Sequence, residues 1–232
     1  MNKIALVTGG NRGLGLETAK QLSQKGFTVF LGARNLAAAE KAAQSIVGSN
    51  KIIPIKLDVS LDIDIQNALK KIAEDFGYLD SLVNNAGVFI DGSNSSILKP
   101  NLDIIKQTFE VNTLGALKLT AAMVPLLKKS TNACVVNVSS GMGQLSDMNG
   151  GYTGYRLSKT ALNAVTKIFA DELSETSIKV NSVCPGWVKT DMGGASAERD
   201  IPTGAKGIVW AATLDKNGPT GGLFRDGEKL EW

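Results

Sequence analysis

Two side chains that can exchange protons, Tyr155 and Lys159, stand four residues apart in the sequence. Residues at this spacing share one face of a helix, so the lysine ammonium can lie beside the phenol. A free tyrosine has a pKa near ~10, and a nearby cation can lower it by roughly 1 to 3 units. The pair therefore predicts proton transfer at neutral pH, although a tyrosine and a lysine at this spacing also occur by chance on helix surfaces.

The chain contains no histidine. This composition excludes histidine general bases, serine–histidine triads and histidine-ligated zinc. Proton transfer would then depend on carboxylates, lysines or the three tyrosines, which are Tyr78, Tyr152 and Tyr155. We predict no metal site.

A glycine-rich stretch, Thr8-Gly9-Gly10-Asn11-Arg12-Gly13-Leu14-Gly15, directly follows the apolar run Ile4-Ala5-Leu6-Val7. It predicts a strand, a tight turn and the start of a helix. Glycines let backbone N–H groups approach a ligand closely, and a helix N-terminus offers unpaired donors with a partial positive charge. The turn favours a bound phosphate, although similar turns occur in α/β proteins that bind nothing.

Arg34 ends the second predicted strand, 19 residues beyond Gly15. In a dinucleotide-binding fold this is the position of the group that meets the adenosine ribose. An acid there would accept a hydrogen bond from the 2′-hydroxyl, whereas an arginine offers planar donors to a 2′-phosphate. With Arg12 close enough to assist, the pair predicts NADP rather than NAD. The alternative is two solvated surface arginines.

Apolar runs of strand length alternate with segments of helical period along the whole chain. We predict strands at 3–8, 27–31, 51–57, 79–83, 133–138, 178–183 and 221–225, and helices at 14–26, 36–46, 63–76, 102–127, 155–173 and 203–213. Pro125 is expected to kink or end its helix. This order predicts one α/β domain over residues 1–232, a doubly wound Rossmann fold with about seven mainly parallel strands and helices on both faces. Its ligand should lie at the carboxyl ends of the strands.

Three loops at that edge are expected to surround a substrate, at about 88–100, 141–154 and 187–202. Small residues, glycines and charges make 192–202 a predicted mobile flap. The loops contribute apolar side chains that predict an adaptable pocket, namely Met142, Leu145, Met148, Trp187 and Met192. These five residues could equally pack within the loops.

Composition narrows the possible partners. The net charge is +3, and the lysines and arginines are scattered, so a nucleic-acid surface is not expected. Cys134 and Cys184 lie in separate apolar segments, which favours reduced thiols and a cytoplasmic location. No apolar stretch reaches membrane-spanning length, and we expect neither a signal peptide nor a membrane partner.

Taken together, these motifs resemble the short-chain dehydrogenase/reductase family over almost the full chain. The similarity includes the glycine turn, Asp58, Asn84-Asn85-Ala86-Gly87, Asn112, Ser140, Tyr155-x-x-x-Lys159, and Pro185-Gly186 with Thr190. Within the family, the glycine turn, the segment Cys184-Pro185-Gly186-Trp187-Val188-Lys189-Thr190-Asp191-Met192 and the terminal tryptophan resemble carbonyl reductases. Only residues 141 to 154 separate Ser140 from Tyr155, so the long insertion of some monomeric carbonyl reductases is missing here.

The resemblance implies roles for four catalytic residues. Tyr155 would donate a proton to a carbonyl oxygen, and Lys159 would lower the tyrosine pKa and hold the nicotinamide ribose. Ser140 would orient the carbonyl, and Asn112 would hold a water that connects Lys159 to solvent. Taken singly, Ser140 could be a turn serine and Asn112 a satisfied helix amide.

The resemblance also implies a set of residues that contact NADP(H). This set is Gly9, Asn11, Arg12, Gly13, Leu14, Gly15, Arg34, Asp58, Val59, Asn85, Ala86, Gly87, Tyr155, Lys159, Pro185, Gly186, Val188 and Thr190.

The sequence therefore predicts an NADPH-dependent reductase of ketones or aldehydes that acts on a small molecule. One alternative is a sensor or scaffold that binds NADP without turnover. Another is a dedicated biosynthetic reductase, for example of a 3-keto group on an acyl carrier or of a terpenoid or alkaloid ketone. Broadly apolar helices near 102–127 and 155–173 predict a homodimer or homotetramer.

Overall fold

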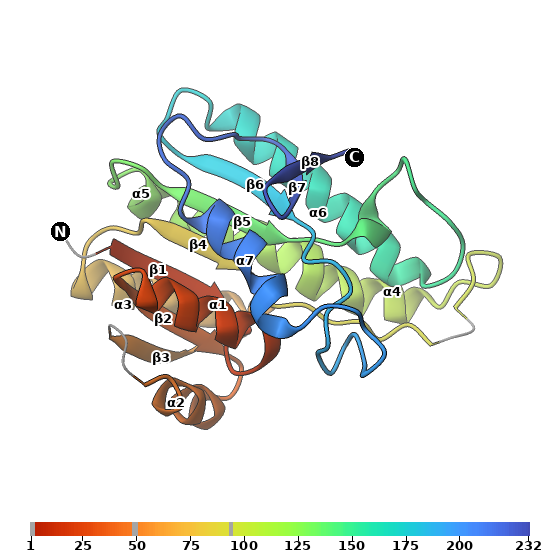
Figure 1. Ribbon diagram of the computed structural model, residues 1–232, viewed down its shortest axis with the longest axis horizontal. Helices are drawn as coiled ribbons and strands as arrows, with labels where there is room; N and C mark the ends of the chain where they lie inside the picture. The colour runs from red at the N-terminus through yellow and green to blue at the C-terminus, as the bar shows by residue number, and fades with distance from the viewer. Residues whose placement is uncertain (1–2, 48–50, 93–94) are drawn as a thin grey trace.

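The architecture of the protein comes from a computed structural model that describes residues 3–47, 51–92 and 95–232. Ser93 and Asn94 of the predicted loop 88–100 lie outside the described residues. Within them the strands are β1 (Lys3–Thr8), β2 (Phe27–Ala33), β3 (Ile52–Lys56), β4 (Ser81–Asn84), β5 (Cys134–Val138), β6 (Lys179–Val183), β7 (Leu223–Arg225) and β8 (Glu228–Leu230). They form one sheet in the order β3-β2-β1-β4-β5-β6-β7-β8 (Figure 1).

Strand order reverses beside β1, which pairs in parallel with both β2 and β4. The central strands are buried along nearly their whole length. Parallel strands of this kind are apolar throughout because helices cover both of their faces. Burial of both faces of the strands therefore explains why these segments of the sequence are continuously apolar.

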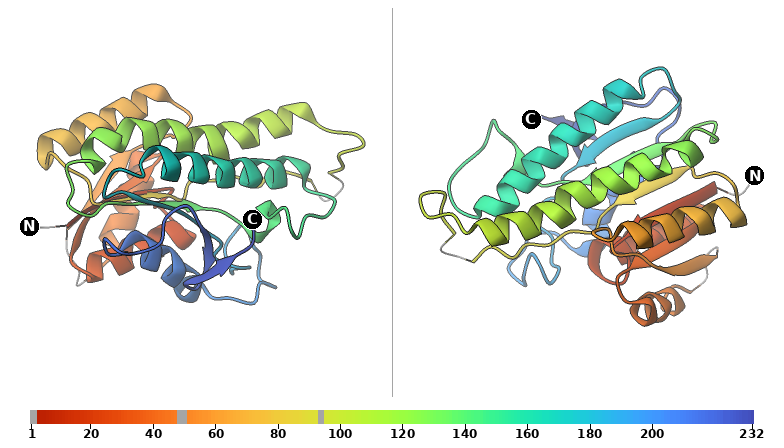
Figure 2. Two further views of the ribbon diagram at one scale, coloured as in Figure 1. Left: turned by 90° about the horizontal axis from the view of Figure 1, so that it is seen from above. Right: turned by 180° about the vertical axis from the view of Figure 1, so that it is seen from behind.

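Helices form a layer on each side of the sheet, as Figure 2 shows. One layer holds α1 (Gly13–Gln24), α2 (Leu36–Gln44) and α7 (Ile201–Ala212). The other holds α3 (Asp62–Asp75), α4 (Leu102–Phe109), α5 (Ala116–Leu127) and α6 (Thr153–Glu172). Each layer packs its own apolar core against the sheet, one around Leu22 and Val29 and the other around Ile72 and Met123. The doubly wound α/β fold is confirmed.

The sheet differs from the prediction at one edge. The described residues contain eight strands rather than about seven, because β8 pairs antiparallel with β7. Asp226 and Gly227, between these strands, have φ angles of 54° and 88°. Two left-handed residues in succession match a tight hairpin turn, and an Asp-Gly pair is a sequence signal for it.

The long helix predicted at 102–127 contains a π-helical turn, η1 (Glu110–Gly115), between α4 and α5. Pro125 lies inside α5, which ends two residues later at Leu127. A side chain at Gly115 would meet Val59 at 2.7 Å, so the turn packs directly on the loop after β3. Such π turns often mark functional sites, and this one carries Asn112.

Candidate active site

A cleft of about 1250 Å³ opens at the carboxyl ends of the strands. Its lining includes every residue predicted to contact NADP(H), from Gly9 in the first loop to Thr190 after β6. A second hollow of about 440 Å³ at the opposite edge of the sheet is lined by none of them. The parallel topology thus gathers residues from distant parts of the chain, as the strand-end argument predicts.

The glycine turn has the backbone geometry of a phosphate cradle. Gly9 and Gly13 have φ angles of 62° and 56°, which favour glycine. A side chain at Gly15 would lie 2.3 Å from the Gly9 carbonyl oxygen, so only glycine fits there. No side chain caps the N-terminus of α1, which leaves its N–H groups available to an anion. These residues fit the pyrophosphate of a dinucleotide.

The turn is held in place by the loop after β4. The Thr8 hydroxyl oxygen accepts hydrogen bonds from the backbone N–H groups of Asn85 at 3.0 Å and Ala86 at 2.9 Å. The Asn85 side-chain amide donates to the carbonyl oxygens of Thr8 at 2.8 Å and Gly9 at 3.2 Å. Asn85 lines the cleft as predicted, but its amide nitrogen is used to hold the turn.

The two arginines expected at the 2′-phosphate differ in their surroundings. Arg34 is exposed at the end of β2, lines the cleft, and has no ion pair with any described residue. Arg12 forms an ion pair with Asp191 at 2.7 Å, and both side chains are 73% exposed. Exposed pairs of this kind are weak. Arg12 would thus have to release a weakly held carboxylate before it could bind an anion, whereas Arg34 has no ion pair to release among the described residues.

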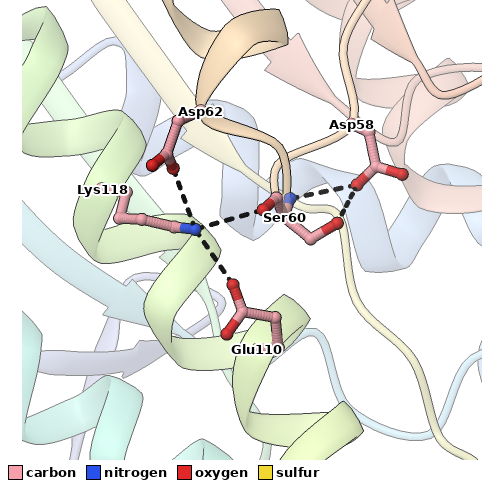
Figure 3. Close-up of polar contacts among 5 residues, drawn as sticks. All are labelled: Asp58, Ser60, Asp62, Glu110 and Lys118. Atoms are coloured by element: carbon pink, nitrogen blue, oxygen red, sulfur yellow. Dashed lines mark hydrogen bonds and ion pairs between the residues drawn. The ribbon is translucent and has the colours of Figure 1, made fainter.

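A polar network orients Asp58, the residue expected at the adenine (Figure 3). Its carboxylate accepts hydrogen bonds from the backbone N–H of Ser60 at 3.0 Å and from the Ser60 hydroxyl at 2.7 Å. The Lys118 ammonium, on α5, donates to the Ser60 carbonyl oxygen at 3.2 Å and pairs with Glu110 at 2.9 Å and Asp62 at 3.1 Å. Sequence reasoning missed this network because its members lie up to 60 residues apart.

Tyr155 and Lys159 lie on α6 and face the cleft. Tyr155 is 8% exposed and Lys159 is 5% exposed. The Lys159 ammonium lies 5.7 Å from the centre of the Tyr155 ring and donates a hydrogen bond of 2.7 Å to the Val138 carbonyl oxygen. Ser140, two residues after β5, also lines the cleft, and its hydroxyl accepts a hydrogen bond from the Met142 N–H at 3.1 Å.

Burial is the main influence on the pKa of Tyr155 in the structure, and the lowering of this pKa by Lys159 stays a prediction. Burial raises the pKa of Tyr155 to about 12, and a hydrogen bond with Ser140 offsets only part of this effect. Burial also lowers the pKa of Lys159 to about 8. Both shifts have one cause, because removal from water disfavours the charged form of each group. In this state the tyrosine is a proton donor at neutral pH.

Asn112 lies behind the wall of the cleft and is 1% exposed. Its carbonyl oxygen accepts from the Val88 N–H at 2.8 Å, and its amide donates to the Val88 carbonyl at 2.9 Å and the Ser158 hydroxyl at 3.0 Å. Asn112 therefore joins η1 to the loop after β4 and to α6. Its role in holding a water stays a prediction.

Three of the five predicted pocket residues, Met142, Trp187 and Met192, line the cleft. Leu145 and Met148 do not, and they are 65% and 38% exposed. Their loop is attached to Trp232, because the Ser146 N–H donates a hydrogen bond of 3.0 Å to the Trp232 carbonyl oxygen. Met142, Trp187 and Met192 therefore lie where a substrate pocket was predicted, and contact of the five residues with a substrate stays a prediction.

Two residues of the site carried no recognisable sequence signal. The Asp91 carboxylate accepts hydrogen bonds from the backbone N–H groups of Gly154 at 2.8 Å and Tyr155 at 2.9 Å, and so caps α6. The Phe89 ring lies 4.6 Å, centre to centre, from the Tyr155 ring. Asp91 and Phe89 both belong to the predicted loop 88–100, so the loop was identified but its function in holding Tyr155 was not.

Comparison with known proteins agrees with this geometry. The family model described as short chain dehydrogenase matches residues 3–200. Over 225 residues the chain is 34% identical to the short-chain dehydrogenase anuI of Penicillium roqueforti (strain FM164), which covers 90% of this chain and 88% of that protein. The structure of the carbonyl reductase Sniffer of D. melanogaster matches with a TM-score of 0.86 and 31% identity over 100% of both chains. That of NADPH-bound carbonyl reductase from chicken fatty liver matches with a TM-score of 0.86 and 27% identity, over 100% of this chain and 99% of that one.

The chain belongs to the short-chain dehydrogenase/reductase family, a family of NAD(P)-dependent oxidoreductases, and the resemblance seen in the sequence is confirmed. Among the described residues, no helix is both long and apolar enough to cross a membrane. The same residues contain no cluster of three acidic or cysteine side chains that could hold a metal ion.

Proposed function

We propose that this protein reduces ketones or aldehydes to alcohols with NADPH, and that residues 1–232 act as one NADP-binding domain. The observation that carries the proposal is the layout of the cleft. At one end, Ser140, Tyr155 and Lys159 meet, and at the other end Arg34 is exposed without an acidic partner among the described residues. The carbonyl reductases among the similar structures, one of them bound to NADPH, support the same function.

NADPH, when bound, would supply the hydride that reduces the carbonyl carbon. Arg34 would bind the 2′-phosphate, and the N–H groups of the glycine turn would bind the pyrophosphate. The buried Tyr155 phenol would donate its proton to the carbonyl oxygen, which the Ser140 hydroxyl would orient. The Lys159 ammonium would stabilise the phenolate that remains and hold the ribose hydroxyls.

The proposal is tested by measuring the consumption of NADPH and NADH with a panel of ketones, aldehydes and quinones. We expect turnover with at least one class of carbonyl and a clear preference for NADPH. Arg34→Ala should reduce this preference about 10- to 100-fold, since a hydrogen bond to a charged group contributes roughly 1.5–3 kcal/mol. A matched control is Lys20→Ala, an exposed cation on the far part of α1.

Binding of NADPH without turnover across the panel would contradict the reductase and favour the sensor. An unchanged preference in Arg34→Ala would contradict the assignment of the 2′-phosphate to Arg34 while leaving the reductase in place.

A further inference from the structure

The loop 187–200 carries Trp187, Thr190 and Met192 to the cleft, yet it contains no helix and no strand of the main sheet. Its two ends are joined at Arg199. The Arg199 N–H donates to the Trp187 carbonyl at 3.0 Å, and the Lys189 N–H donates to the Arg199 carbonyl at 2.9 Å. The position of Arg199 therefore determines where the loop stands over the cleft.

The Arg199 side chain is anchored outside the loop. Its guanidinium pairs with both carboxylate oxygens of Asp226, each at 2.6 Å. The side chain is 20% exposed and passes so close to Gly186 that a Cβ there would lie 2.6 Å from the Arg199 Cδ atom. Two parallel N–H···O bonds fix the orientation of the guanidinium as well as its place. The other ion pair of the loop, Arg12 with Asp191, is far more exposed.

Asp226 stands on a hairpin that is joined to the main sheet. It occupies the left-handed turn between β7 and β8, and β7 pairs with β6, which is separated from the start of the loop by three residues. The neighbouring Arg225 donates to the Cys184 sulfur at 3.1 Å, and that sulfur also accepts the Gly141 N–H at 3.1 Å. The hairpin thus contacts two residues that line the cleft, Cys184 through Arg225 and Arg199 through Asp226. The paired Arg199 guanidinium lowers the pKa of the Asp226 carboxyl below its usual value.

We propose that Asp226 and Arg199 are positioning residues, and that the β7–β8 hairpin uses this ion pair to hold the loop 187–200 closed over the cleft. The pair acts through Trp187, Thr190 and Met192, which would contact the nicotinamide end of NADP(H) and the carbonyl substrate. The ligands named in this inference are those of the proposed function, on which that part rests. The closure of the loop by the ion pair does not depend on the proposed function.

The decisive variant is Asp226→Asn. Asparagine suits a left-handed turn before glycine as well as aspartate does, so the hairpin is kept while the charge is lost. The matched control is Glu228→Gln, which removes one negative charge from the same hairpin, since Glu228 is exposed and forms no ion pair with a described residue. Arg199→Lys keeps the positive charge but loses the two parallel hydrogen bonds. Its rate of tryptic cleavage and its KM should lie between those of the wild type and those of Asp226→Asn.

Two measurements separate positioning from simple stabilisation. Lys189 is exposed within the loop, so the rate of tryptic cleavage after it reports how often the loop opens. We expect about five- to tenfold faster cleavage in Asp226→Asn, because this variant weakens one charge-assisted ion pair. The dissociation constant of NADP⁺ and the KM of the carbonyl substrate should rise by a similar factor, with a smaller change in kcat.

Cleavage and KM values equal to those of Glu228→Gln would overturn the proposal. A lowered melting temperature with unchanged cleavage after Lys189 would also overturn it, because the pair would then only stabilise the fold. If the protein bound no NADP(H) at all, the cleavage rates would still test the closure of the loop, so the failure of the proposed function is distinguishable.

Discussion

At the scale of single residues, burial decides what Tyr155 and Lys159 can do. The Tyr155 phenol holds its proton because its pKa is raised to about 12. The Lys159 ammonium loses its proton at a lower pH than an exposed lysine does, because its pKa is lowered to about 8. A protonated phenol is the state required of a general acid. The environment of Tyr155 thus keeps the phenol in the protonated state that a general acid needs.

Replacement of Tyr155 by phenylalanine removes the hydroxyl and retains the ring that packs on Phe89. We expect carbonyl reduction to fall by about 10²- to 10⁴-fold, the usual contribution of a general acid, with little change in NADPH binding. Steady-state kinetics and a fluorescence titration of NADPH measure the two effects. Tyr152→Phe is the matched control, because Tyr152 lines the same cleft. Near-normal turnover in Tyr155→Phe would exclude the assigned role.

The pH dependence of reduction should follow Lys159. The lysine is charged below its pKa of about 8 and neutral above it, so the stabilisation of a developing phenolate is lost as the pH rises. We therefore expect kcat/KM for reduction to decline above about pH 8, while Tyr155 remains protonated. In Lys159→Arg the cation persists to much higher pH, and the decline should move upward even if the enzyme is slower. A decline at the same pH in both proteins would show that another group is responsible.

At the scale of secondary-structure elements, the start of α6 is the part that places Tyr155. Tyr152 precedes the helix in a left-handed conformation with a φ angle of 49°. Such a residue is costly unless its surroundings hold it. Asp91 supplies this support from another loop, because its two carboxylate oxygens accept hydrogen bonds from N–H groups in the first turn of the helix. Tyr155 therefore lies in the helical turn that Asp91 caps.

Removal of this cap should weaken the protein. We expect Asp91→Ala to lower the free energy of unfolding by about 1–2 kcal/mol, as for other helix caps, and to lower kcat because one of the freed N–H groups belongs to Tyr155. Asp91→Asn retains one oxygen acceptor and should lose less. Urea denaturation of the three proteins measures the effect. Equal stability of Asp91→Ala and the wild type would mean that solvent replaces the cap without cost.

At the scale of the whole molecule, one face carries large apolar side chains in contact with solvent. They lie on the continuous helix formed by α4, η1 and α5 and on α6, which runs beside this helix on the same side of the sheet (Figure 2). The group comprises Leu102, Leu114, Leu117, Leu157 and Ile168, with exposed fractions from 38% to 60%. Exposed apolar groups concentrated on neighbouring helices favour association with another subunit.

We therefore expect a homodimer or homotetramer. Light scattering at micromolar concentration measures the mass directly, and Leu117→Glu combined with Leu157→Glu should shift it toward the monomer by placing charges in the interface. Lys70→Glu, on the exposed face of α3, is a control of surface charge. A wild-type protein that is monomeric at this concentration would contradict the expectation.

Most of the cleft can be predicted from the order of residues along the chain. That order brings the glycine turn, Asp58, Gly87 and Ser140 to the same edge, since successive parallel strands joined by right-handed crossovers must all end there. The type and spacing of residues along each strand end then indicate what binds. The hairpin at Asp226-Gly227 is also present in the sequence as a turn signal. Its second strand was not predicted because Glu228, Lys229 and Leu230 contain no apolar run.

The sequence by itself determined the sheet, its helical layers and the residues at its carboxyl edge, because those features follow from local apolar patterns and from glycines that no other residue can replace. Only the tertiary structure decided the rest. The pKa values of Tyr155 and Lys159 depend on burial by many elements, the cap from Asp91 crosses 64 residues to reach Tyr155, and the ion pair from Asp226 crosses 27 to reach Arg199. Contacts between such distant residues follow from packing in three dimensions, and no short stretch of sequence contains them.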